Sequence, residues 1–309
     1  MEETELIPLS ASRVKTFETC SQIYYAQYVQ KIRSASNLGA QLGTITHAIL
    51  ECLIKDRHAQ SVKQIRVTES LNPSVTRLLN RHLDNIDVNT PENFEKVTGF
   101  ILVALETDFY FEGCEKIAEP EFKFDIVDKQ KRFRIKGFID IFAFYKDHAK
   151  IVDYKTSKSK FSSEDLAKNL QAKIYQWVVK QVFNLPSTIE FLFLKFKRNP
   201  VLAIGTFSDL EFEELENYLT EVSAKMASFR QSDATSSLAS CSRDKWLCGS
   251  TVEGKWCCQY RKPFDYYAVV NGDGEVFNTS INESELTKRL KDGQVVIKKR
   301  YKGCPAWNS

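Results

Sequence analysis

The chain has 309 residues, of which 43% are hydrophobic, so it can bury a substantial core in one large domain or in two modest ones. Its 43 basic and 40 acidic residues give a formal net charge of +3, which excludes binding to nucleic acid through a strong overall field and leaves that role to local basic patches. The sequence contains no apolar run long enough to span a bilayer.

The N-terminal stretch MEETELIPLSASR is acidic and lacks the basic and apolar segments of a secretory signal. We therefore expect a cytoplasmic protein with no membrane partner. In that compartment the eight cysteines are expected to be reduced thiols or metal ligands rather than disulfides.

The first part of the chain is predicted to be helical. Helix-type periodicity, with Ser, Asn or Pro at the expected starts, covers four segments: residues 8–29, 37–57, 72–86 and 91–111. In the second of these, Ile45, Ile49 and Leu53 form an apolar stripe at helical spacing.

A change to alternating polar and apolar residues then predicts three strands in a meander, at residues 118–127, 131–146 and 149–157. A helix follows at 162–183 and ends before Pro186. Two more strands, at 187–196 and 200–208, and an amphipathic helix at 208–230 complete the segment. The order α, β, β, β, α, β predicts an α/β fold with a mixed sheet flanked by helices.

After residue 230 the pattern changes twice. Residues 231–264 are polar, loop-like and rich in cysteine, and residues 265–309 are predicted to form a small ββαβ-like appendage with a hairpin turn at NGDG. We therefore expect three regions, at residues 1–230, 231–264 and 265–309. The sequence assigns no role to the appendage.

Two aspartates interrupt the apolar strands. Asp140 lies in KGFIDIFAF and Asp153 in KIVDYKTS, and hairpin pairing of these strands would place the two carboxylates side by side. Side chains alternate along a strand, so Asp153 and Lys155 face the same way. Paired carboxylates favour a Mg²⁺ or Mn²⁺ ion, which can bind a scissile phosphate and activate water while Lys155 orients that water. The alternative is that both aspartates are edge residues paired with nearby lysines.

These segments resemble the PD-(D/E)XK nuclease superfamily, specifically its RecB-like exonuclease branch. GFIDIF is similar to the G-x-x-D segment of that branch at Asp140, and IVDYKTS is similar to its I-V-D-Y-K-T segment at Asp153 and Lys155. QAKIY supplies the Gln171 and Tyr175 of its Q-x-x-x-Y helix. The resemblance implies a restriction-endonuclease-like αβββαβ core and places these five residues in the catalytic site.

The resemblance extends to both sides of these motifs. GTITHAILE is similar to the G-x-x-x-H-x-x-L-E helix of the branch, which implies that His47 is a metal ligand. An acidic residue in the strand before Asp140 completes the ligand set of the branch. Glu119 is preferred, and Glu121 on the same strand face is the alternative.

The cysteines resemble those of the AddB-type and CRISPR-associated iron-sulfur nucleases, which pair an N-terminal cysteine with three near the end of the core. The resemblance implies a [4Fe-4S] cluster held by Cys20, Cys241, Cys248 and Cys258, with Cys257 as the alternate to Cys258. The spacing C-x6-C-x8-C-C departs from the usual C-x-x-C, so Zn²⁺ and unligated thiols stay open as alternatives. The other cysteines, Cys52, Cys114 and Cys304, are interpreted as core or incidental residues.

The resemblance as a whole implies a metal-dependent DNA exonuclease that acts on single strands or free ends in recombination, repair or replication, with a helicase or recombination protein as a possible partner. A structure-specific endonuclease and a catalytically silent DNA-binding or assembly subunit are the alternatives. Lys195, Lys197 and Arg198 are candidate phosphate contacts, with a solvated strand end as the alternative.

Overall fold

The structure is a computed structural model, and it describes residues 6–33, 37–117, 122–230, 233, 245–252, 255–287 and 290–305. The chain forms two compact units. Ser36–Leu219 is here called the sheet unit, and Met1–Ala35 together with Thr220–Ser309 is called the cysteine unit. No helix among the described residues is both long enough and apolar enough to cross a membrane.

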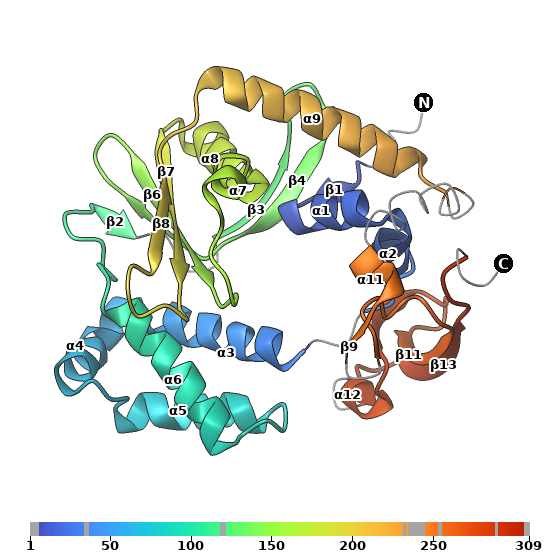
Figure 1. Cartoon of the computed structure of the whole chain (residues 1–309), viewed down its shortest axis with the longest axis horizontal. Coiled ribbons are helices and arrows are strands. Elements are labelled where there is room, and N and C mark those ends of the chain that lie inside the picture. The colour runs from blue at the N-terminus through green and yellow to red at the C-terminus, as the bar shows by residue number, and fades with distance from the viewer. Residues whose placement is uncertain are drawn as a thin grey trace. The chain divides into compact units, whose positions relative to one another are not determined.

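The sheet unit contains a five-stranded mixed sheet with the order β2-β5-β6-β7-β8, flanked by helices (Figure 1). Its strands are β2 (Lys116–Ile117), β5 (Ile141–Phe144), β6 (Ala149–Lys155), β7 (Ser187–Phe193) and β8 (Val201–Ile204). Strands β6 and β7 run parallel, and the other neighbouring pairs are antiparallel. This arrangement confirms the predicted α/β class.

The parallel pair needs a crossover connection, which two helices provide. They are α7 (Ser163–Ala167) and α8 (Leu170–Phe183). One continuous helix was predicted here, and that prediction is wrong because Asn169 starts a new helix by accepting a hydrogen bond from the Ala172 backbone N–H at 2.9 Å. The split gives α8 a capped start just before Gln171.

The predicted middle strand of the meander is also divided. Strand β3 (Phe122–Val127) pairs with β4 (Arg134–Ile139), whereas β5 pairs with β6 in the five-stranded sheet. The chain bends between β4 and β5 at Asp140, so this residue sits at a strand break rather than inside a strand.

Four helices pack beside the sheet around one core. They are α3 (Leu38–Leu53), α4 (Ala59–Thr68), α5 (Pro73–Asp84) and α6 (Pro91–Leu105), and a short 3₁₀ turn (Asp56–His58) precedes α4. Asn37, Asn72 and Thr90 cap α3, α5 and α6 through their side chains. Buried aliphatic residues of these helices contact the sheet at Ile141 and Tyr154, which fixes α3 beside β6. Helix α4 was not predicted.

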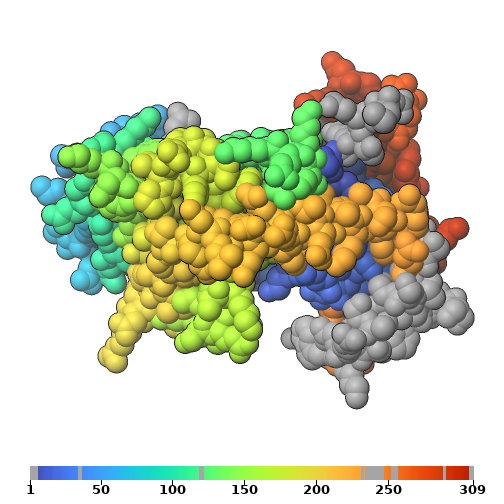
Figure 2. Space-filling view, turned by 90° about the horizontal axis from the view of Figure 1, so that it is seen from above, coloured from blue at the N-terminus to red at the C-terminus, as the bar shows by residue number. Residues whose placement is uncertain are grey.

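The loop between β7 and β8 and the loop that follows β6 start at the same end of the sheet, because β6 and β7 are parallel. Its exposed tip at Lys197–Asn199 corresponds to the narrow yellow protrusion at the lower left of Figure 2. After β8, helix α9 (Asp209–Ser228) begins in the sheet unit and continues beyond Leu219.

The cysteine unit combines the two ends of the chain. Its N-terminal elements are β1 (Pro8–Leu9), α1 (Ala11–Thr19), α2 (Ser21–Tyr24) and a π-helical turn (Tyr25–Val29). Its C-terminal elements are α11 (Lys245–Gly249), β9 (Thr251–Val252), β10 (Lys255–Trp256), β11 (Phe264–Val270), β12 (Val276–Ser280), α12 (Glu283–Thr287) and β13 (Val295–Tyr301). A single N-terminal helix was predicted, but the extended backbone of Cys20 (φ −162°) separates α1 from α2.

Strands β11 to β13 form a three-stranded sheet with the order β12-β11-β13. Ala26 and Ile32 from the N-terminal segment pack against Tyr260, Tyr266 and Tyr301 of the C-terminal segment. The hydroxyl of Tyr260 donates to the Ile32 carbonyl at 2.8 Å. The two ends of the chain therefore share one core in this unit.

Candidate active site

Asp140 and Asp153 meet where the pairing of β5 and β6 ends. Ile141 pairs with Val152, so the next residues along the two strands are the aspartates. The Tyr154 backbone N–H donates to Asp140 Oδ2 at 2.9 Å, which holds this carboxylate against β6. The sequence argument placed the two carboxylates side by side, and the structure brings them together at this strand end.

Asp153 is buried, with 3% of its surface exposed. Its Oδ1 accepts a hydrogen bond from Gln171 Nε2 at 2.6 Å. Its Oδ2 forms an ion pair with Lys155 Nζ at 2.5 Å. The pKa of Asp153 is raised to about 6. Burial is the main cause; the charge of Lys155 opposes the rise, and the charge of Asp140 adds to it. A dication near the site would favour the ionised form of this carboxylate.

Gln171 and Tyr175 lie one turn apart on α8 and complete the network around Asp153. Lys155 Nζ donates to Gln171 Oε1 at 2.8 Å, and Gln171 Nε2 donates to Tyr175 Oη at 2.9 Å. Burial, and next the charge of Asp153, raise the pKa of the Tyr175 hydroxyl, so Tyr175 is neutral at physiological pH. The arrangement fixes Lys155 and Asp153 through one amide side chain.

His47 reaches the site from α3. Its Nδ1 lies 3.3 Å from Asp140 Oδ1, and its ring meets the Tyr154 ring edge to face at 5.7 Å. Burial lowers the pKa of His47, but the hydrogen bond with Asp140 and the charges of Asp140 and Asp153 outweigh it, so the net pKa is raised. The His47 imidazole therefore lies beside the Asp140 carboxylate.

The close approach of α3 to β6 depends on Gly43. A Cβ atom at this position would lie 2.7 Å from Thr156 Oγ1, directly after the strand that carries Asp153 and Lys155. A side chain here would push α3, and His47 with it, away from the end of β6.

The remaining predicted acid, Glu119, lies outside the described residues, and so does Glu121. In the part of the chain that the structure describes, no three His, Cys, Asp or Glu side chains form a group that could hold a metal ion. The oxygen donors at the strand end fit Mg²⁺ or Mn²⁺, because both are hard cations that prefer carboxylates. Lys155 holds the position beside Asp153 Oδ2.

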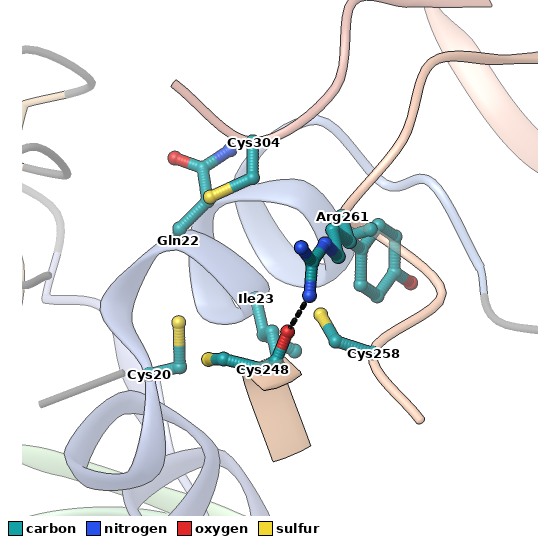
Figure 3. A pocket seen from close by; sticks show the side chains of 8 residues that line it. Cys20, Gln22, Ile23, Cys248, Cys258, Arg261 and Cys304 are labelled. Atoms are coloured by element: carbon teal, nitrogen blue, oxygen red, sulfur yellow. Dashed lines mark hydrogen bonds between the residues drawn. The ribbon is translucent and has the colours of Figure 1, made fainter. Parts of the chain in front are cut away.

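A second cluster of chemistry-bearing residues lies in the cysteine unit. Cys20, Cys248, Cys258 and Cys304 line one cavity, together with Gln22 and Arg261 (Figure 3). All four cysteine side chains are buried. Cys20 lies between α1 and α2, Cys248 lies in α11, Cys258 lies between β10 and β11, and Cys304 follows β13.

The cavity differs from the predicted cysteine set at two points. Cys241 lies outside the described residues, and Cys257 does not line the cavity, whereas the adjacent Cys258 does. Cys304 was interpreted as a core or incidental residue; it is buried, and it lines the cavity because the chain returns there after β13. The Cys304 backbone N–H donates to the Arg261 carbonyl at 3.2 Å, and the Arg261 guanidinium donates to the Cys248 carbonyl.

Ionising these thiols together is unfavourable without a cation. Burial raises the pKa of Cys258 to about 12, and the neighbouring Cys20, Cys248 and Cys304 raise it as well. Bound metal would stabilise the thiolate forms, because a cation offsets their mutual repulsion.

Comparison with known proteins identifies a matching family and similar structures. A family model described as the PD-(D/E)XK nuclease superfamily matches residues 8–251. A search of curated proteins found no match to this sequence. A candidate exonuclease from Eubacterium rectale has a similar structure, with 13% identity, a TM-score of 0.45, and coverage of 71% of this chain and 80% of that chain.

A protein from Vibrio cholerae is more distant, with 10% identity, a TM-score of 0.24, and coverage of 71% of this chain and 57% of that chain. Because these likenesses are low, the assignment depends on the family model, which covers well over half of the chain. The chain belongs to the PD-(D/E)XK nuclease superfamily, whose members are metal-dependent nucleases.

Proposed function

We propose that this protein is a Mg²⁺- or Mn²⁺-dependent DNA exonuclease that acts on free ends or single strands in recombination, repair or replication. The observation that carries the proposal is the convergence of Asp140, Asp153 and Lys155 at one strand end, where the buried Asp153 lies against Lys155.

In this proposal each side chain has one task. Asp140 and Asp153, with Glu119 and His47, would hold the metal ion. Lys155 orients the attacking water through its ammonium group, and Gln171 keeps Lys155 and Asp153 at hydrogen-bond distance. Tyr175 fixes the Gln171 amide from the same helix. The bound dication supplies positive charge that stabilises the phosphate in the transition state and lowers the pKa of the water.

We also propose that Cys20, Cys248, Cys258 and Cys304 hold a [4Fe-4S] cluster, with Cys304 in the place first assigned to Cys241. A zinc ion bonds to sulfur at about 2.3 Å, so four zinc ligands must converge on one point. A cluster accepts ligands that are spread around a cavity, because each thiolate binds a different iron. The four thiols come from four separate segments and line one cavity, which supports the cluster; a zinc site is the alternative.

The proposed cluster would have a structural role in the cysteine unit. It would join α2 near the N-terminus to three C-terminal segments, including the residues after β13. Closing such long loops in the unfolded chain stabilises the folded state through chain entropy. The appendage formed by β11, β12, α12 and β13 would then be held at both ends, at Cys258 and Cys304.

The requirement for ends is tested with matched DNA substrates. Purified protein is incubated with Mg²⁺ or Mn²⁺ and the same DNA as a linear strand, a linear duplex and a covalently closed single-stranded circle. The proposal predicts mononucleotide or short products from linear DNA and an intact circle. Cleavage of the circle would identify an endonuclease instead, and no cleavage of any substrate with either metal would leave a DNA-binding or assembly subunit.

A further inference from the structure

Two loops beside the candidate active site carry only positive charge. The loop after β6 contains Lys158 and Lys160, and the loop after β7 contains Lys195, Lys197 and Arg198. Residues 155–163 and 191–208 contain neither Asp nor Glu. Both loops start at the end of the sheet that holds Lys155, because Lys155 pairs with Phe193 in the parallel ladder.

The two loops are joined to one another. The Lys160 ammonium donates to the Asn199 carbonyl and lies 5.0 Å from the centre of the Phe196 ring. Phe161 packs edge to face on Phe193 at 5.4 Å. The positive side chains therefore belong to one packed surface rather than to two independent loops.

Helix α6 adds a further cation. Lys195 Nζ lies 6.0 Å from the centre of the Phe100 ring of α6, and Lys96 stands one helical turn before Phe100. Burial lowers the pKa of Lys195, and the charges of Lys96 and Lys158 lower it further, so the three ammonium groups are near enough to repel one another. Among the described residues, Lys96, Lys158 and Lys195 form no ion pair that would offset this repulsion.

We infer that Lys96, Lys158, Lys160, Lys195, Lys197 and Arg198, here called the basic edge, bind the phosphates of the substrate strand next to the scissile bond, without reading its sequence. Unpaired lysines that are held together at an electrostatic cost are stabilised by a polyanion. Lysine is a point charge without the planar fork of arginine, so it contacts phosphate rather than a particular base. The exposed tip at Lys197–Asn199 extends this surface outward from the sheet unit (Figure 2).

This inference rests on the proposed function, because it takes DNA as the ligand. It adds a direction for the strand, from Lys155 across the loops after β6 and β7 towards α6. The DNA path then lies over the ends of the two parallel strands rather than over the β2 edge of the sheet.

The test measures DNA binding without cleavage. Fluorescein-labelled single strands of two unrelated sequences are titrated with protein in EDTA, and the anisotropy is followed across a series of KCl concentrations. The variant Lys96→Gln/Lys158→Gln/Lys195→Gln should bind at least about tenfold more weakly at low salt, equally for both sequences. The slope of log affinity against log salt should fall by about two units, since each lost contact with a single strand removes about 0.7.

The matched control removes the same charge elsewhere in the sheet unit. Lys116 on β2 and Lys146 after β5 lie at the opposite end of the sheet from Lys155, since Lys116 pairs with Phe144 and Phe144 pairs with Ala149. Lys63 is exposed on α4. The variant Lys63→Gln/Lys116→Gln/Lys146→Gln should keep the wild-type affinity and slope. Circular dichroism spectra establish that both variants are folded.

The outcomes separate the two proposals. If the wild type cleaves DNA but the basic-edge variant keeps its affinity and slope, or if the control loses as much, the inference is wrong and the proposed function stands. If the wild type neither binds nor cleaves DNA, the proposed function is wrong, and the inference with it. Unequal losses for the two sequences would overturn the part of the inference that excludes base recognition.

Discussion

Gln171 donates a hydrogen bond to Asp153 Oδ1 at 2.6 Å, and the carbonyl oxygen of the same amide accepts one from Lys155 at 2.8 Å. One neutral side chain on α8 thus bridges the acid and the ammonium group of the candidate site. The amide supplies both a donor and an acceptor, whereas an ionised carboxylate accepts only and an ammonium donates only.

Replacing Gln171 with Ala should therefore lower kcat about 10- to 100-fold, with a smaller change in KM, since the side chain orients other groups and does not itself react. Tyr175→Phe is the control within the same network: it removes one acceptor from the Gln171 amide but keeps both bonds to Asp153 and Lys155. Its loss should stay below about tenfold. Steady-state kinetics on labelled DNA check both values. A Gln171→Ala enzyme with wild-type kcat would contradict the assigned positioning role.

Metal binding should depend on pH through Asp153 and His47. Burial, opposed by Lys155 and reinforced by Asp140, raises the pKa of Asp153 to about 6, and the contact with Asp140 raises the pKa of His47 despite its burial. A dication needs the Asp153 carboxylate ionised and the His47 imidazole neutral, so protons compete with metal on the acid side. Affinity for Mn²⁺ should be nearly constant well above these pKa values and fall as the pH drops through about 6.

Mn²⁺ binding measured by electron paramagnetic resonance on the DNA-free protein, from about pH 5 to about pH 8, checks this prediction. One displaced proton gives about a tenfold loss per pH unit, and two give a steeper fall. A His47→Gln variant should lose only the His47 component. Affinity that does not change with pH would exclude both residues as ligands.

The contact between Gly43 and Thr156 predicts a rescue experiment. Gly43→Ala places a Cβ 2.7 Å from Thr156 Oγ1, so the free energy of unfolding should fall by about 1–3 kcal/mol through overpacking. The double variant Gly43→Ala/Thr156→Ala removes that oxygen and should recover most of the loss, because Thr156 Cβ lies at an ordinary 3.7 Å.

Gly99 offers a matched control in the middle of α6. No atom lies within 4 Å of a Cβ at this position, so Gly99→Ala should stabilise the protein by about 1 kcal/mol through helix propensity alone. Urea denaturation of the wild type and the three variants measures these free energies of unfolding. Destabilisation by Gly43→Ala that persists in the double variant would show that the Thr156 hydroxyl is not the cause.

The cysteine cavity predicts which thiols the cluster requires. Cys304→Ser should remove the brown colour and broad absorption near about 400 nm of an anaerobically purified sample, together with its iron. Cys257→Ser should keep both, because Cys257 does not line the cavity although it adjoins Cys258. Iron retained at the wild-type level in Cys304→Ser would exclude this ligand. A colourless wild type with bound zinc would replace the cluster with a zinc site.

Much of the fold could be predicted because its signals are local. The Asn72 and Pro91 helix starts and the apolar stripe through Ile45 and Ile49 mark helices that the structure contains. The breaks could not be predicted in the same way. Around Asp140 the strand pattern continues unbroken in sequence, and the bend is visible only because β4 and β5 pair with different partners.

The residues of the two candidate sites also differ in whether the sequence alone could identify them. Asp153, Lys155, Gln171 and Tyr175 lie close together in sequence on β6 and α8, so short motifs could identify them, although their hydrogen bonds required the structure. Cys304 is separated from Cys258 by a complete ββαβ segment, and no spacing rule connects the two. Only the packing of the cysteine unit brings Cys304 to the cavity. The predicted domain boundaries stay predictions.

The central claim is that the buried acid and lysine on β6 perform metal-dependent hydrolysis of DNA. The most direct test compares cleavage of end-labelled linear DNA by the wild type, Asp153→Asn, Lys155→Ala and Lys150→Ala, each with Mg²⁺, Mn²⁺ or EDTA. Lys150 is the matched control on the same strand, where it pairs with Glu190 at 3.0 Å.

We predict cleavage with either metal and none in EDTA, a loss of about 10²- to 10⁴-fold for Asp153→Asn and Lys155→Ala, and wild-type rates for Lys150→Ala. Cleavage that persists in EDTA, or that survives both the Asp153 and the Lys155 substitutions, would contradict the account.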